Sequence, residues 1–174
     1  EPGVEEGSSK IILNVVEDDL VSGSITLDNH GNRYTAKQRS TVKIDVNNPS
    51  KIGDKLSITK TFNTGEKFDF SQFDYEVPLG QSGLKAFASA SRLEFEIGKE
   101  LKTNPVSLGN ADTYEVGIKY PIQRTNNQSV FLRTSIEKKE IYNGTTGVLT
   151  NDKTLENAKI AVSYTHLRAH ETTD

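Results

Sequence analysis

Few residues in this sequence combine the side-chain type and the spacing that metal chemistry requires. His166 and His170 are four residues apart, and Glu171 follows the second histidine. On a helix, this spacing would place both imidazoles on one face as zinc ligands. Zinc peptidases, however, carry a glutamate directly after the first histidine. We therefore predict no metal site at this position.

The remaining candidates for chemistry are explained equally well by turns. Asp18 and Asp19, together with Asp28, are carboxylates of the kind that bind calcium. They fall in a linker and at the start of a turn, where solvation and turn formation account for acidic residues. His30 lies in an Asn-His-Gly-Asn turn, and no serine has the sequence context of a nucleophile elbow. We predict that the chain is not an enzyme, with no catalytic residues and no cofactor.

Composition excludes several classes of protein. The chain has 174 residues, enough for one domain, and a formal net charge of -3 that gives no basic footprint for nucleic acid. Cysteine is absent, which removes disulfides and thiolate metal sites. The chain starts at Glu1 and contains no methionine, so we expect a mature or internal fragment. No apolar run reaches the ~20 residues of a membrane helix, but membrane barrels, whose strands are apolar at alternate positions, remain possible.

The dominant pattern is an alternation of apolar and polar residues with period two. Val42, Ile44 and Val46, for example, alternate with Lys43 and Asp45. Such alternation predicts antiparallel strands that are apolar on one face and polar on the other. Similar segments lie at residues 21–28, 56–62, 73–79, 113–122 and 130–137. A segment at 84–97 alternates less regularly and switches its apolar face near Arg92, which indicates either a β-bulge or an incorrect assignment of the faces of this strand. Residues 10–17 are apolar on both faces and predict a strand outside this sheet.

Connection lengths favour a membrane barrel over a sandwich without deciding between them. The connections at residues 47–54, 78–83 and 121–128 are short and rich in Pro and Gly. Those at 28–37, 98–112 and 142–154 are longer, with a shorter one at 64–68. Successive connections of an up-and-down sheet lie at opposite ends, so one end has tight turns and the other mostly long loops. Transmembrane barrels have this asymmetry.

The polar positions of these strands form the candidate site. They either line a hydrated pore or form a solvent-exposed sheet face, and alternation alone cannot choose between the two. The candidate residues are Lys43, Asp45, Asp74, Glu76, Glu115, Lys119, Arg133 and Glu137.

Several motifs, in order, resemble a known family. They are GSSKIILNVVE at 7–17, VSGSITLDNHGNRYT at 21–35, NNPSKIGDKLS at 47–57, YEVPLG at 75–80 and YPI at 120–122. Their order and spacing over roughly residues 1–140 resemble the ShlB/FhaC/HecB family of haemolysin secretion and activation proteins. The sequence departs from the family at Ala36, where glycine is common.

The resemblance implies an outer-membrane β-barrel of about 16 strands, of which this chain would be a part. Residues 1–17 would be the C-terminal end of the second periplasmic POTRA domain, and residues 18–161 the N-terminal half of the barrel. We expect about seven to eight strands in an open, curved, all-β antiparallel sheet, because closure requires strand number, tilt and shear to agree. Residues 162–174 resemble translated adapter sequence, and we expect them to be a non-native tail.

The resemblance also implies a function. The whole protein would be a two-partner secretion transporter of the bacterial outer membrane, exporting and activating a large unfolded exoprotein of the haemagglutinin or haemolysin type. Its partners would be that exoprotein and outer-membrane lipid, and the full-length pore would be monomeric. The eight polar residues would face its lumen. Two alternatives stay open: a BamA-like assembly barrel of the same superfamily, and a soluble β-sandwich adhesin or binding module.

Overall fold

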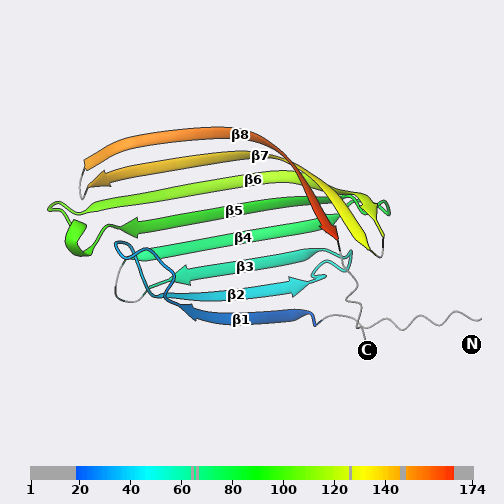
Figure 1. The fold of residues 1–174 in the computed structure, drawn as a ribbon, viewed down its shortest axis with the longest axis horizontal. Helices are drawn as coiled ribbons and strands as arrows, with labels where there is room; N and C mark the ends of the chain where they lie inside the picture. The colour runs from blue at the N-terminus through cyan, green and yellow to red at the C-terminus, as the bar shows by residue number, and fades with distance from the viewer. Residues whose placement is uncertain (1–18, 64, 66, 126, 146–147, 167–174) are drawn as a thin grey trace, which may run out of the picture.

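The chain folds into a single antiparallel sheet, drawn in Figure 1. The computed structural model describes residues 19–63, 65, 67–125, 127–145 and 148–166. Eight strands follow one another in sequence order, and β1 and β8 form unpaired edges. The predicted all-β, up-and-down, unclosed sheet is therefore confirmed. The strands are β1 (Val21–Asp28), β2 (Arg39–Asn47), β3 (Lys55–Phe62), β4 (Phe68–Pro78), β5 (Lys85–Glu96), β6 (Ser107–Arg124), β7 (Gln128–Thr145) and β8 (Val148–His166), with a short 3-10 helix, η1 (Lys99–Leu101), between β5 and β6.

The alternating sequence gives the sheet two chemically different faces. Side chains of successive strand residues point to opposite faces, and directly paired residues share a face. Val46, Leu56 and Tyr75 are paired in turn across β2, β3 and β4, and the row continues to Ala88 and Val116. We call this side the apolar face and the opposite side the polar face.

The apolar face is uncovered. Among the described residues, Ala36 is the only buried apolar residue, and it lies in a loop rather than in the sheet. Ile25, Ile136 and Ile160 on the apolar face are 75%, 64% and 79% exposed. Soluble proteins rarely expose apolar patches larger than a few hundred Å², so this sheet has the surface of a membrane barrel rather than that of half a sandwich. Among the described residues, no helix is long and apolar enough to cross a membrane.

The apolar face forms a band that ends before the strands do. On β6 the band runs from Tyr114 to Tyr120, or about 20 Å at ~3.4 Å per residue. This approaches the ~25 Å apolar band of outer-membrane barrels. Beyond Tyr114, toward the loops after β1, β3 and β5, the same face carries Asp112 paired with Arg92 across β5 and β6. The strands therefore extend past the apolar band at the end that carries these loops.

The predicted bulge near Arg92 is wrong. Pairing of β5 is continuous with β4 from Lys85 to Phe95 and with β6 from Lys85 to Glu96. The apolar residues change faces because the environment changes along the strand: Ala90 lies in the apolar band, whereas Leu93 lies beyond it on the polar face. The irregularities of the sheet lie elsewhere, between Pro121 and Gln123 and between Asn143 and Gly144.

Two other predictions concern the C-terminal part. The long loop expected at residues 142–154 is wrong, because β7 continues to Thr145 and β8 begins at Val148. β8 also extends through His166, so residues 162–166 of the expected tail pair with β7. Whether that segment is native stays a prediction. The expected POTRA remnant at residues 1–17 lies outside the described residues, and so does the off-sheet strand at 10–17.

The turn between β2 and β3 is fastened by a buried carboxylate. Asp54 is only 2% exposed and accepts hydrogen bonds from the Tyr75 hydroxyl at 2.7 Å and from the Ser50 backbone N–H at 3.1 Å. Gly53 has φ of +82°, a left-handed conformation that favours glycine. Burial raises the pKa of the Asp54 carboxyl, but the hydrogen bonds from Tyr75 and Ser50 outweigh burial and hold that pKa below its ordinary value.

Candidate functional site: the polar face of the sheet

All eight candidate residues lie on the polar face. The strand register places four of them in one row that crosses the sheet: Asp45, Asp74, Glu115 and Glu137. Serines separate three of these carboxylates. The row reads Ser22, Asp45, Ser57, Asp74, Ser89, Glu115, Glu137 and Asn157 from β1 to β8. The other four, Lys43, Glu76, Lys119 and Arg133, lie an even number of residues away along their strands and so share the face.

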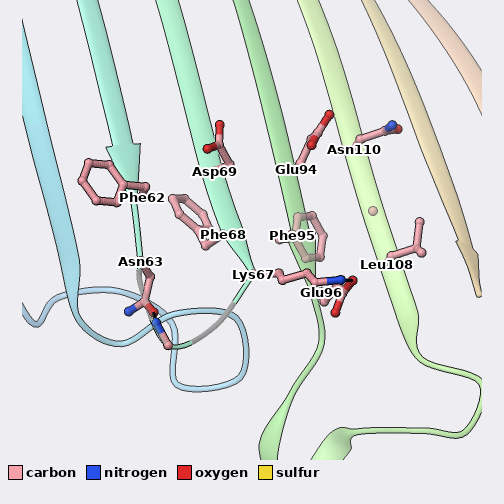
Figure 2. Close-up of a pocket in the computed structure, with 12 residues that line it drawn as sticks. Phe62, Asn63, Lys67, Phe68, Asp69, Glu94, Phe95, Glu96, Leu108 and Asn110 are labelled. Carbon is pink, nitrogen blue, oxygen red and sulfur yellow. Dashed lines mark hydrogen bonds and ion pairs between the residues drawn. The ribbon is translucent and has the colours of Figure 1, made fainter. Parts of the chain in front are cut away.

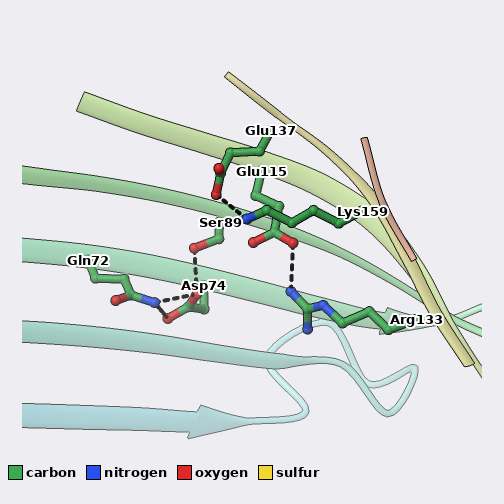
Figure 3. Close-up of polar contacts among 7 residues, drawn as sticks. All are labelled: Gln72, Asp74, Ser89, Glu115, Arg133, Glu137 and Lys159. Atoms are coloured by element: carbon green, nitrogen blue, oxygen red, sulfur yellow. Dashed lines mark hydrogen bonds and ion pairs between the residues drawn. The ribbon is translucent and has the colours of Figure 1, made fainter. Parts of the chain in front are cut away.

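Each carboxylate of this row is held by donors on the same face. Asp45 accepts the Ser57 hydroxyl and lies 3.1 Å from the Lys43 ammonium. Asp74 accepts the Ser89 hydroxyl at 2.7 Å and the Gln72 amide at 2.9 Å, as Figure 3 shows. Asp74 is thus held by uncharged donors, whereas Asp45 has a cation beside it.

Glu115 and Glu137 lie directly opposite each other on β6 and β7, an arrangement that is unfavourable for like charges. Arg133 lies 3.1 Å from Glu115, and Lys159 of β8 pairs with Glu137 (Figure 3). The two cations therefore reach the carboxylates from the same face, and β8 supplies one of them. Glu115 and Glu137 are only 17% and 14% exposed, so their charges need these partners.

Cations and aromatic rings gather toward the short-turn end of the polar face. Lys85, Lys119 and Arg133 are paired in turn across β5, β6 and β7. The Lys119 ammonium lies 4.6 Å from the centre of the Phe131 ring, and the Arg133 guanidinium lies 3.6 Å from that of Phe87. Both distances are within the range of cation–π attraction. Lys85 also pairs with Glu76 at 2.6 Å.

Sequence reasoning missed the uncharged and cationic partners of the candidate residues. Ser57, Gln72 and Ser89 occupy alternate strand positions that belong to the polar face. Nothing else in the sequence distinguished them from other surface residues. Asn157 and Lys159 were missed because no strand was predicted where β8 lies. Their alternation with Ala158 and Ile160 was the available signal.

The polar face changes character close to the loops. Phe70 pairs with Leu93, and Phe68 with Phe95, across β4 and β5. These apolar residues lie on the same face as Asp74, and Phe70 and Phe68 are four and six residues further toward the loops along β4. The charged part of the polar face thus gives way to an aromatic patch, and Arg39 stacks on Phe68 at 4.1 Å from the ring centre.

A hollow of about 780 Å³ lies at the loop ends of β3 to β6 (Figure 2). Its acidic residues are paired: Asp69 with Lys60, and Glu96 with Lys67 at 2.6 Å. Across the part of the chain that the structure describes, no group of three or more His, Cys, Asp or Glu residues could hold a metal ion. The hollow therefore carries charge pairs and aromatic edges rather than a set of metal ligands.

The architecture can now be compared with known proteins. Residues 7–174 match the family described as haemolysin secretion/activation protein ShlB/FhaC/HecB. The chain belongs to this family. The predicted resemblance is confirmed.

Individual relatives agree with the family. The heme/hemopexin transporter protein HuxB of Haemophilus influenzae is 21% identical over 139 residues, which are 80% of this chain and 24% of HuxB. CdiB from Escherichia coli has a similar fold, with a TM-score of 0.77 and 19% identity over 96% of this chain and 32% of that one. CdiB from Acinetobacter baumannii also has a similar fold, with a TM-score of 0.68 and 16% identity over 87% of this chain and 30% of that one. The chain thus spans about a quarter to a third of the length of these relatives.

Proposed function

We propose that this chain is part of the wall of an outer-membrane pore through which a large unfolded exoprotein is exported, with the polar face toward the lumen and the apolar face toward lipid. The observation that carries the proposal is the contrast between the two faces: one is self-paired and charged, whereas the other is apolar and uncovered.

The polar face suits a passing polypeptide. Its charges are neutralised locally, as between Arg133 and Glu115, so the wall offers few strong unpaired sites to which an extended chain would bind tightly. Hydroxyls and amides on the same face, such as those of Ser89 and Gln72, supply exchangeable hydrogen bonds that replace those of water. A lumen of this kind lets an unfolded chain move rather than holding it, and it requires no catalytic group.

The finer assignments follow from family membership. We propose that the exoprotein is of the haemagglutinin or haemolysin type, that the complete pore is monomeric, and that it lies in the bacterial outer membrane. The strands beyond the apolar band, with Arg92 and Asp112 on their outer side, would rise above the lipid toward the cell exterior. The eight candidate residues would then contact the exoprotein or its hydration water.

Deletion of the gene that encodes this chain tests the proposal. In the source bacterium, one large protein should disappear from the culture medium and return on complementation with the full-length gene. Unchanged secretion of every large protein would contradict the proposal. A general loss of outer-membrane barrel proteins would instead support the assembly-barrel alternative.

A further inference from the structure

The connection between β1 and β2, residues 29–38, is folded on itself. The Gly31 N–H donates to the Lys37 carbonyl at 3.0 Å, and the Ala36 N–H to the Asn32 carbonyl at 2.9 Å. The Asn32 side chain also accepts the Tyr34 N–H at 2.8 Å. Ala36 is completely buried, which is unusual for a loop residue in a sheet that lacks a core. We call residues 29–38 the strap.

The strap bends over the polar face. Arg39, the first residue of β2, lies on the polar face with Lys43, and its Nε donates to the Ala36 carbonyl at 3.3 Å. The same guanidinium stacks on Phe68 of β4, also on the polar face. Because one side chain contacts both the strap and Phe68, the strap lies on the side of the sheet that we assign to the lumen.

The strap also reaches the far side of β4. The Gly98 N–H, just after β5, donates to the Tyr34 carbonyl at 2.7 Å, and Arg33 pairs with Glu100 of η1. Asn63, after β3, donates to the Gln38 carbonyl. β2 and β5 are three strand spacings apart, or about 14 Å. The strap therefore crosses the loop ends of β3 and β4, as the loop at the end of β1 in Figure 1 shows.

We propose that the strap is a movable cover at the outer mouth of the pore, docked at rest on the segment after β5 and tied through its Ala36 carbonyl to Arg39, which stacks on Phe68, and released when a polypeptide passes. The proposal rests on the proposed function. Among the described residues, the contacts at the far end of the strap include a backbone hydrogen bond and an ion pair whose side chains are 62% and 60% exposed. Such contacts are individually weak, so the far end can detach while the Gly31 and Ala36 hydrogen bonds keep the strap folded.

A reversible cross-link in the full-length transporter tests the strap. Arg33→Cys and Glu100→Cys introduce two exposed thiols into a chain that has none. A bis-maleimide reagent with a disulfide in its spacer then ties the strap to η1, and dithiothreitol reopens the link. We expect the linked transporter to secrete its exoprotein about tenfold less than the unlinked one, as for other lids that must open. Reduction should restore secretion, and each single-cysteine variant treated with the reagent should secrete normally.

The outcomes separate the two proposals. Linked protein that secretes as fast as unlinked protein would overturn the movable strap. If the wild type and the unlinked variant both fail to secrete any exoprotein, the proposed function fails instead. The result for the cross-link and the result for secretion itself come from the same cells and the same assay.

A second variant examines the strap without a cross-link. A Cβ at Gly31 would lie 1.9 Å from the Ala36 carbonyl oxygen, so Gly31→Ala must unfold the strap. At Gly98, where φ is -116°, a Cβ would make an ordinary contact of 3.6 Å with the Tyr34 carbonyl oxygen, which makes Gly98→Ala the matched control. In planar bilayers we expect higher conductance from Gly31→Ala and wild-type conductance from Gly98→Ala. Equal conductance in all three proteins would contradict a cover over the mouth.

Discussion

The ring of Phe87 on β5 lies across Gly117, the residue paired with it on β6. A Cβ at Gly117 would come within 2.7 Å of the Phe87 ring and 2.3 Å of the Thr134 carbonyl oxygen. Phe95 covers Gly109 on the same two strands in the same way. An aromatic ring placed over a glycine shields a backbone that no side chain protects, and it pins the register of the two strands.

Gly117→Ala should therefore destabilise the sheet. The added methyl group meets backbone on one side and a ring that Arg133 already covers on the other. We expect a loss of about 1–3 kcal/mol in the free energy of unfolding, the usual effect of overpacking. Unfolding of the full-length barrel by denaturant in lipid measures it, with Gly98→Ala as the control that adds the same methyl group in open contact. Equal midpoints for the two variants would show that the ring moves aside freely.

The Asp54 turn predicts a pH-dependent contribution to stability. The folded-state pKa of Asp54 lies below its ordinary value of 3.8. A carboxyl whose pKa is lowered by folding contributes stability above its unfolded pKa, and this contribution is lost as the pH falls through the folded pKa. Wild type should therefore exceed Asp54→Asn in thermal midpoint above about pH 4, and the difference should shrink below that pH.

Tyr75→Phe tests the hydrogen bond that the Tyr75 hydroxyl donates to Asp54 in the same turn. It removes the 2.7 Å hydrogen bond but leaves the Ser50 N–H in place, so it should lower the midpoint less than Asp54→Asn does. The measurement is the thermal midpoint of wild type, Asp54→Asn and Tyr75→Phe from pH 3 to pH 7, a range that brackets the ordinary carboxyl pKa. If the difference in thermal midpoint between wild type and Asp54→Asn stays constant across the whole pH range, Asp54 does not act through its charge.

The opposed pair Glu115 and Glu137 predicts a specific role for Lys159. Lys159→Gln removes the cation that pairs directly with Glu137 and leaves it facing Glu115, so the sheet should unfold at a lower temperature. Lys153→Gln removes the same charge from the same strand and face, but Lys153 is paired with Ile141. We expect a smaller effect there. Equal midpoints for the two variants would count against the paired-charge interpretation.

The sequence predicted the parts of this fold that depend on local alternation. β2 was predicted correctly because apolar and polar residues alternate there over a whole strand. The same alternation places Lys43 and Asp45 on one face of the sheet, and that this face lines a lumen stays a prediction. The open sheet followed from strand number, since too few strands were available to close a large barrel.

Alternation failed where strands leave the apolar band. Beyond the band, the side of the sheet that was apolar carries charged residues and the side that was polar carries Phe95 and Leu93, so the pattern inverts without any change in backbone pairing. This inversion explains the bulge wrongly predicted at Arg92. The start of β8 was predicted as a loop because Asn151 and Asp152 are common in turns and do not alternate with apolar residues. The strap was not predicted, since its hydrogen bond with Gly98 and its ion pair with Glu100 join segments far apart in sequence.

The assignment of faces can be tested at two adjacent residues of β5. Ser89 lies on the polar face beside Asp74, and Ala88 lies on the apolar face, paired with Tyr75 and Val116. Ser89→Cys and Ala88→Cys each introduce one small thiol at the same depth of the same strand. In intact outer membranes that contain the full-length protein, a membrane-impermeant maleimide should label Ser89→Cys through the pore water. It should leave Ala88→Cys unlabelled, because a thiolate does not form in hydrocarbon. Stronger labelling at residue 88 than at 89 would place the charged face toward lipid and reject the pore.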